Sequence, residues 1–399
     1  MITKDLILRI FSAANILRWN DHIRPLNFYE LDKQAHKMII AYIIAKFEEE
    51  DGKLIDWTRL IEGGIFEFFQ RIMLTDLKPE IFHEIMSKKE KELNKWVIKN
   101  LSNDLAALKG NFDERCSKYL LEANYAIYEK RILKAAHCLS TKWEFDIIYP
   151  WNSMIYDIEK TKQEIEYSAN AFDDLVGVRK LLINNRKYYG FLDLCGQLRF
   201  QQRWAHIFRV PKTNVLGHML TVAILAYILS LDMKVSDSRR FNNFYSSLFH
   251  DLPEILTKDI IKPVKTSVFG LEDIIKHYEK KRISNKILPL IPLNWRLEMR
   301  YFIEDEFSDK IIEGSDIKKV DDAMNFNNDK YNAVDGSLIE VCDKLCAYIE
   351  VSIALEYGIR SSILIKSKET LYDEYSNVKK SSLDFKQLFN YFHQEESSA

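Results

Sequence analysis

The stretch from residue 249 to 265 holds the side chains best suited to metal-dependent chemistry. A histidine is followed directly by an aspartate at His250-Asp251, and two further acids, Glu254 and Asp259, come shortly after. Imidazole and carboxylate groups ligate divalent metals, but adjacent residues of a helix point about 100° apart. The pair can therefore bind one metal only where the helix ends or where a neighbouring helix supplies further ligands.

The composition limits which classes of protein fit this chain. It has 399 residues, enough for two or three domains, and 47% of them are hydrophobic. The formal net charge is only −2, so no overall field favours nucleic acid as a partner. The five cysteines include no CxxC pair, which is typical of reduced thiols in the cytoplasm.

Targeting signals are not evident either. The first residues include Asp5 where a signal peptide would carry basic residues, and we expect no run of 18 uncharged apolar residues that could span a membrane. These observations predict a cytoplasmic protein without a membrane partner.

Turn-forming residues are scarce, with 12 Gly and 8 Pro, and no alternating β-type runs stand between turn signals. The sequence therefore predicts an all-α fold. A polar, Asn-rich insert at residues 314–336 is expected to be a loop. Expected helices cover residues 6–20, 34–50, 56–74, 79–108, 112–145, 157–184, 188–203, 214–231, 242–256, 271–286, 293–307 and 337–357, and the tail ends in a short aromatic segment at 385–393.

The chain repeats itself loosely. Arg18-Trp19 matches Arg203-Trp204. His36, which opens a helix with Ala41-Tyr42-Ile43, matches His218, which opens one with Ala226-Tyr227-Ile228. Where the second copy has His250-Asp251, the first has Glu67-Phe68, and phenylalanine cannot ligate a metal. His36 and His137 of the first copy are interpreted as structural. We therefore predict a degenerate helical domain at residues 1–155, a connecting helix at 156–185 and an intact domain at 186–399.

The second half resembles the HD superfamily of phosphohydrolases, and within it the bacterial 5′-deoxynucleotidases. The resemblance covers most of residues 190–360 and rests on several pieces. These are Arg203-Trp204, His218 fifteen residues after the arginine, His250-Asp251 with Glu254 and Asp259, the exit Pro263-Val264-Lys265, and the segment 337–348 around Asp343. It implies tandem HD-type helical bundles, of which the second keeps the metal site.

The resemblance implies a ligand set of His218, His250, Asp251 and Asp343. Taken alone, His218 would be read as a core histidine and Asp343 as a salt-bridge acid. Two imidazoles and two carboxylates suit one divalent transition metal, namely Mn, Co, Fe, Ni or Zn. Dinuclear relatives need further histidines, and residues 252–342 contain only His277.

The neighbouring residues have expected roles in phosphate ester hydrolysis. Glu254 and Asp259 are predicted to handle protons, with Asp259 the favoured acid/base in the resemblance. Arg203 and Lys265 are predicted to contact phosphate, and Trp204 to lie against the sugar. The acidic run 304–306 is expected to be a solvated face.

Three functions remain open from the sequence. The leading one is release of phosphate from (deoxy)nucleoside 5′-monophosphates. The others are hydrolysis of nucleoside triphosphates and nucleotide sensing with weak or no turnover. The expected partner is a nucleotide or another small phosphate ester, and the two copies are expected to pack as an intramolecular pseudo-dimer that could itself pair as a homodimer.

Overall fold

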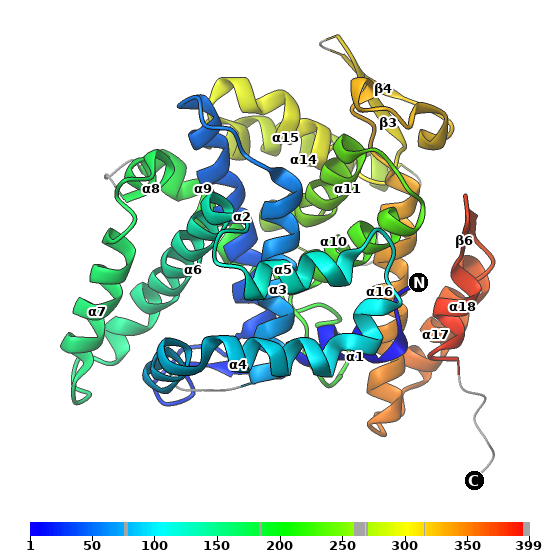
Figure 1. The fold of residues 1–399 in the computed structure, drawn as a ribbon. Coiled ribbons are helices and arrows are strands. Elements are labelled where there is room, and N and C mark those ends of the chain that lie inside the picture. The colour runs from blue at the N-terminus through cyan, green and yellow to red at the C-terminus, as the bar shows by residue number, and fades with distance from the viewer. Residues whose placement is uncertain (76–78, 183–185, 259–267, 269, 315, 394–399) are drawn as a thin grey trace.

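The computed structural model describes residues 1–399 except 76–78, 183–185, 259–267, 269, 315 and 394–399 (Figure 1). Helices make up most of the described chain, as the scarcity of turn residues predicts. The prediction of an all-α fold is confirmed, and the prediction of tandem copies stays a prediction.

The described residues of the first half form helices α1 to α6. The predicted helix at residues 112–145 is two helices, since turn residues 122–126 separate α5 from α6. The connector predicted as one helix is likewise two helices, α7 and α8. Their bounds are α1 Lys4–Ser12, α2 Glu30–Glu50, α3 Trp57–Leu74, α4 Pro79–Ala106, α5 Phe112–Leu121, α6 Ile127–Ile148, α7 Ile158–Asn170 and α8 Val176–Leu182.

The second half supplies the remaining described helices. One of them, α17, was missed because its sequence is rich in charge. The bounds are α9 Arg186–Gln197, α10 Val215–Asp232, α11 Asp237–Phe249, α12 Glu254–Thr257, α14 Leu271–Arg282, α15 Arg296–Ile303, α16 Gly336–Glu356, α17 Ser362–Tyr375 and α18 Phe385–Asn390.

Three short antiparallel ribbons interrupt the helices. They pair β1 Leu17–Arg18 with β2 Phe28–Tyr29, β3 Lys310–Glu313 with β4 Asp316–Lys319, and β5 Lys379–Lys380 with β6 Leu383–Asp384. The β3–β4 hairpin begins before the insert predicted as loop and extends into it, and single-turn 3₁₀ helices follow it. Figure 1 shows this hairpin and α7 at opposite edges of the molecule.

One large apolar core joins the two halves of the chain. Its buried side chains run from Ile2 near the N-terminus to Phe392 near the C-terminus. Helix α2 of the first half lies against α10 of the second, and Asp32 accepts hydrogen bonds from Asn214 Nδ2 at 2.7 Å and from the Gly217 backbone N–H at 3.0 Å. A Cβ at Gly217 would lie 2.9 Å from Asp32 Oδ1, so this position requires a glycine for the two helices to approach.

Reciprocal contacts flank this α2–α10 pair. From α2, the Tyr42 ring packs on Tyr245 of α11, with ring centroids 4.8 Å apart. From α10, the Tyr227 hydroxyl donates to Glu62 of α3 at 2.9 Å. The helix that bears His218 is therefore held on both sides by the first half of the chain.

The prediction that no apolar run could span a membrane is wrong for α10. By length and composition this helix could cross a bilayer, yet 94% of it is buried inside the fold. Its apolar residues are explained by its place at the centre of the core, where all sides of a helix contact protein.

Candidate metal centre

The end of α11 positions His250 and Asp251. The apolar residues Tyr245, Leu248 and Phe249 are fully buried and anchor the helix, which ends at Phe249 with His250 as its C-cap. Asp251 lies in the following turn, before α12. The expected continuous helix through residue 256 is thus broken at the histidine, and this break lets the two adjacent side chains turn toward one point.

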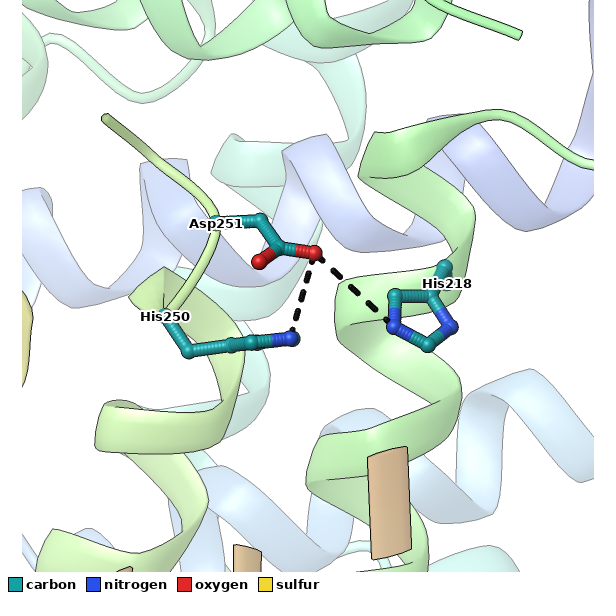
Figure 2. Close-up of side chains that lie close together, drawn as sticks. All are labelled: His218, His250 and Asp251. Atoms are coloured by element: carbon teal, nitrogen blue, oxygen red, sulfur yellow. Dashed lines mark ion pairs between the residues drawn. The ribbon is translucent and has the colours of Figure 1, made fainter. Parts of the chain in front are cut away.

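The third member of the site comes from α10. His218 lies in the first turn of this helix and is almost fully buried. Asp251 Oδ2 lies 3.2 Å from His250 Nε2 and 3.8 Å from His218 Nε2. Figure 2 shows this carboxylate oxygen between the two rings. In the described part of the chain, these three residues are the one group that could hold a metal, with ligand atoms within 4.8 Å of one another.

Asp343 joins the group through His218. It lies on α16, and its Oδ1 is 2.8 Å from His218 Nε2, while its Oδ2 accepts from Lys344 Nζ at 2.6 Å. Helix α16 is fixed at its start, because Asp335 caps it and Gly336 packs so closely that a Cβ would lie 2.3 Å from the Ser308 carbonyl oxygen. All four predicted ligands are therefore brought together from α10, α11 with its following turn, and α16.

The electrostatics of the site favour a bound cation. Burial and the nearby Arg203 lower the pKa of His218, so its ring is neutral. Burial opposes a charge on His250, yet the carboxylate of Asp251 raises the pKa of His250 to about 9. The negative charges of Asp251 and Asp343 thus favour a proton on His250, and a bound metal ion would neutralise the same charges in its place.

The residues present fit a divalent metal. His250 Nδ1 donates to the Ser247 carbonyl oxygen at 2.7 Å, which fixes the ring orientation. His250 Nε2 is then left buried without a hydrogen-bond partner in the described structure, directed at Asp251. A cation between these imidazoles and carboxylates would satisfy that nitrogen, and a mixed nitrogen and oxygen donor set suits a transition metal.

Arg203 lies beside the carboxylates. Its Nη1 is 3.9 Å from Asp251 Oδ2, its Nη2 is 4.0 Å from Asp343 Oδ1, and its Nε is 3.4 Å from Glu350 Oε2. Trp204 Nε1 donates to the same Glu350 oxygen at 2.9 Å. The indole nitrogen is therefore engaged by Glu350, and the predicted contact of Trp204 with a sugar stays a prediction.

Sequence reasoning missed Glu350. Its carboxylate is buried about two helical turns beyond Asp343 on α16 and accepts from Thr213 Oγ1 at 2.5 Å. Burial would raise its pKa, but Arg203 and Arg209 outweigh that effect and lower the pKa of Glu350 to about 2. Glu350 therefore stays ionised and holds Arg203. The match between Trp19 and Trp204 was a signal that could have led to it.

Within the acidic run 304–306, which was interpreted as a solvated face, Glu306 lies near the site, whereas Asp305 pairs with Lys280 and Lys319. Burial raises the pKa of Glu306, and the charges of His250 and Asp251 act on it as well. The neighbouring Phe307 packs its ring against His250, with centroids 6.2 Å apart, and Lys344 Nζ lies 5.3 Å from the centre of that ring. These residues close one side of the metal centre.

The predicted proton-transfer residues are only partly placed. Glu254 begins α12 one turn after Asp251, and its backbone carbonyl accepts from Gln201 Nε2 at 3.1 Å. Asp259 and Lys265 lie outside the described residues, so their predicted roles stay predictions.

Known proteins resemble the second half of the chain. The family model described as HD domain matches residues 195–372. A 5′-deoxynucleotidase of Vibrio atlanticus is 26% identical over 167 residues, which are 41% of this chain and 73% of the relative. A 5′-deoxynucleotidase of Yersinia pestis is 22% identical over 181 residues, 43% of this chain and 77% of the relative.

A solved structure also aligns with part of the chain. It is an HD-domain phosphohydrolase from Listeria innocua, with 17% identity and a TM-score of 0.36, and the match covers 47% of this chain and 82% of that one. The family match spans α10, α11 and α16, which carry all four candidate ligands. The second half of this chain is therefore similar to HD domains over residues 195–372.

Proposed function

We propose that the second half of the chain releases phosphate from (deoxy)nucleoside 5′-monophosphates with the help of one divalent transition metal. The observation that carries this proposal is the convergence of His218, His250 and Asp251 on one point, with Asp343 joined to them and Arg203 beside the carboxylates. The curated relatives named 5′-deoxynucleotidase support the choice of substrate.

His218, His250, Asp251 and Asp343 would hold the metal. When bound, it would polarise a phosphoryl oxygen and lower the pKa of a water molecule. Two carboxylates match the charge of a divalent ion, and the rigid attachment of His250 to Ser247 keeps its Nε2 directed into the site.

Arg203 would bind the phosphate. Its planar guanidinium can donate two parallel hydrogen bonds to phosphate oxygens, and Glu350 holds its Nε side so that Nη1 and Nη2 face the metal ligands. Lys265 would add a second cationic contact. A phosphate bound there would lie between the arginine and the metal.

Asp259 and Glu254 would move the protons. Hydrolysis of a phosphate monoester needs a proton for the leaving sugar oxygen and a base for the attacking water. Both residues follow the Asp251 ligand within eight positions. Glu306, whose pKa is raised by burial, is a further carboxyl group beside His250 and Asp251.

The first half would support this site. We propose that residues 1–155 are a degenerate copy of the domain at 186–399 and pack against it as an intramolecular pseudo-dimer, with 156–185 as connector. The reciprocal contacts of Tyr42 with Tyr245 and of Tyr227 with Glu62 support this arrangement, because a two-fold relation makes the same surfaces meet twice.

Phosphate release measured on a nucleotide panel tests the function. The metal-stripped full chain would be supplied with Mn, Co, Fe, Ni or Zn and given ribo- and deoxyribonucleoside mono- and triphosphates. We expect inorganic phosphate from monophosphates only. Release of phosphate or triphosphate from triphosphates would favour the second hypothesis, and binding without turnover under every metal would favour a sensor.

A further inference from the structure

The first half contains a buried cluster of basic side chains that the proposed function does not use. Lys33, fully buried on α2, contacts the ring of His137 on α6, whose Nε2 lies 3.3 Å from the ammonium nitrogen. His137 is partly exposed at the surface, while its ring nitrogens lie against the buried ammonium. In the described part of the chain, no carboxylate forms an ion pair with Lys33.

The surroundings of this contact match those of the metal centre. Arg18 Nε and Trp19 Nε1 both bond Glu144 Oε2, at 2.8 and 2.9 Å, as Arg203 Nε and Trp204 Nε1 approach Glu350 Oε2. Trp19 and Trp204 share a backbone φ of 56°, which non-glycine residues seldom adopt. The two arginine–tryptophan pairs therefore sit in equivalent local structures.

The spacing identifies which residues occupy the ligand positions. Lys33 follows Arg18 by the same fifteen residues that separate His218 from Arg203. His137 precedes Glu144 by the same seven residues that separate Asp343 from Glu350. The contact between Lys33 and His137 thus stands where His218 meets Asp343, and it corrects the match of His36 with His218.

This exchange reverses the charge of the position. A metal centre gathers carboxylates around a cation, whereas here a lysine and an imidazole replace a histidine and an aspartate. Lys37 lies nearby and pairs with Glu67 Oε2 at 3.0 Å. The cluster holds more basic side chains than carboxyl groups, namely Arg18, Lys33, Lys37, Arg71 and Arg199 against Glu30, Asp32, Glu67 and Glu144.

Lys37 and the arginines of the cluster have carboxylate partners, whereas among the described residues Lys33 and His137 form no ion pair with a carboxylate. Burial, with Arg18 and Lys37 nearby, holds the pKa of Lys33 well below its usual value. Burial together with Lys33, Lys37 and Arg18 does the same to the pKa of His137. A bound anion would restore the charge of both groups, and a phosphate dianion offers acceptors for several donors at once.

We propose that the first half binds the phosphate group of a phosphate monoester, or inorganic phosphate, between Lys33, Lys37 and His137, at the position equivalent to the metal centre. This site needs no metal and shares no residue with the catalytic site. Phosphate binding at Lys33 would change the contact between α2 and α10 as the concentration of substrate or product changes, since Lys33 directly follows Asp32, which bonds Gly217 of α10. The phosphate site can be disproved while the hydrolase function holds, and the hydrolase function can be disproved while the phosphate site holds.

Equilibrium dialysis of the metal-stripped full chain against radiolabelled inorganic phosphate tests the site. An Arg203→Ala background removes the phosphate contact of the second half. We expect one phosphate per chain, with affinity lowered at least about tenfold by Lys33→Met and by Lys37→Met. Lys134→Met is the matched control, since this exposed lysine lies one turn before His137 on α6, and it should leave affinity unchanged.

Several outcomes overturn the proposal. Absence of binding in the Arg203→Ala background does so, as does unchanged affinity in Lys33→Met. If circular dichroism shows that Lys33→Met does not fold, His137→Ala decides, because His137 is partly exposed and the loss of its ring should leave the fold intact. Unchanged affinity in that variant contradicts the site. A deoxynucleoside monophosphate, added as competitor, then separates a nucleotide site from one for free phosphate.

Discussion

Asp32 Oδ1 accepts a hydrogen bond at 3.0 Å from the backbone N–H of Gly217, the residue before the metal ligand candidate His218. A carboxyl group of the first half is thus buried against the start of the helix that carries the metal centre. Burial raises the pKa of Asp32 to about 6, against an ordinary 3.8, although Arg199 nearby and the hydrogen bonds from Asn214 and Gly217 favour its ionised form.

The raised pKa predicts a pH-dependent stability. Between about pH 4 and pH 6 the folded chain binds a proton at Asp32 that the unfolded chain has lost, so stability falls as pH rises through this window. Above pH 6 the full cost of the buried charge applies, on the order of 3 kcal/mol. Asp32→Asn should therefore raise the melting temperature more at pH 8 than at pH 4.5.

Thermal unfolding of both chains across this pH range checks the prediction. Asp51→Asn, an exposed change at the end of the same helix, is the control and should leave the pH profile as it is. An Asp32→Asn effect of equal size at both pH values would contradict the assignment of the buried charge.

In the Glu350→Gln variant, Arg203 should remain in the site but lose its fixed orientation. Removing the charge leaves Arg203 and Arg209 without their buried counterion, which should cost about 2 kcal/mol or more of stability. Because the guanidinium is then held less firmly, we expect KM to rise roughly tenfold with a smaller change in kcat. Steady-state kinetics and melting curves measure both effects.

A matched variant separates orientation from stability. Glu62→Gln also removes a buried carboxylate, one paired with Arg115 at 2.5 Å, but far along the chain from the metal centre. It should lower the melting temperature without raising KM. Equal kinetic effects in the two variants would mean that Glu350 acts only through the fold.

The sequence predicted the parts of this molecule that rest on local pattern. The apolar run before His250 predicted a buried helix, which is confirmed, but its predicted continuation to residue 256 is wrong because the helix ends at Phe249. Glu350 was missed because a lone glutamate within an apolar helix carries no local signal. Its role arises from a loop more than a hundred residues earlier in the chain, which places Arg203 and Trp204 against it.

Other features depend on tertiary contacts that no spacing reveals. The β3–β4 hairpin forms from a short charged segment, where Lys310 is buried and its ammonium donates to the carbonyl oxygens of Tyr301 and Glu304, each at 2.7 Å. Nearby, Glu306 and Phe307 lie close to His250. The apolar helix α10 was underestimated because its single acid, Asp232, stands at its last position.

Asp259→Asn should separate metal binding from catalysis. We expect the variant to keep its metal and to lose about 10²- to 10⁴-fold in kcat, the usual contribution of a positioned acid/base. Metal analysis and single-turnover phosphate release measure the two properties. Loss of metal from this variant would make Asp259 a ligand, and near-normal turnover would shift the proton-transfer role to Glu254.

A fragment starting at residue 186 should expose the face of α10 that α2 covers. Leu220 and Ile224 of α10 lie together with Met38 and Phe68 of the first half, and their exposure should cause aggregation or dimerisation. Size-exclusion chromatography with light scattering gives the mass. A monomeric, fully active fragment would show that residues 1–155 form an independent module.

The metal dependence of phosphate release by wild type and His250→Ala tests the central claim most directly. Elemental analysis and phosphate release would be measured on the same samples, after stripping and after reloading with each divalent ion. The account predicts about one metal per wild-type chain with activity that returns in proportion to it, and neither metal nor activity in His250→Ala. Two metals per chain, or full activity in the stripped protein, would contradict it.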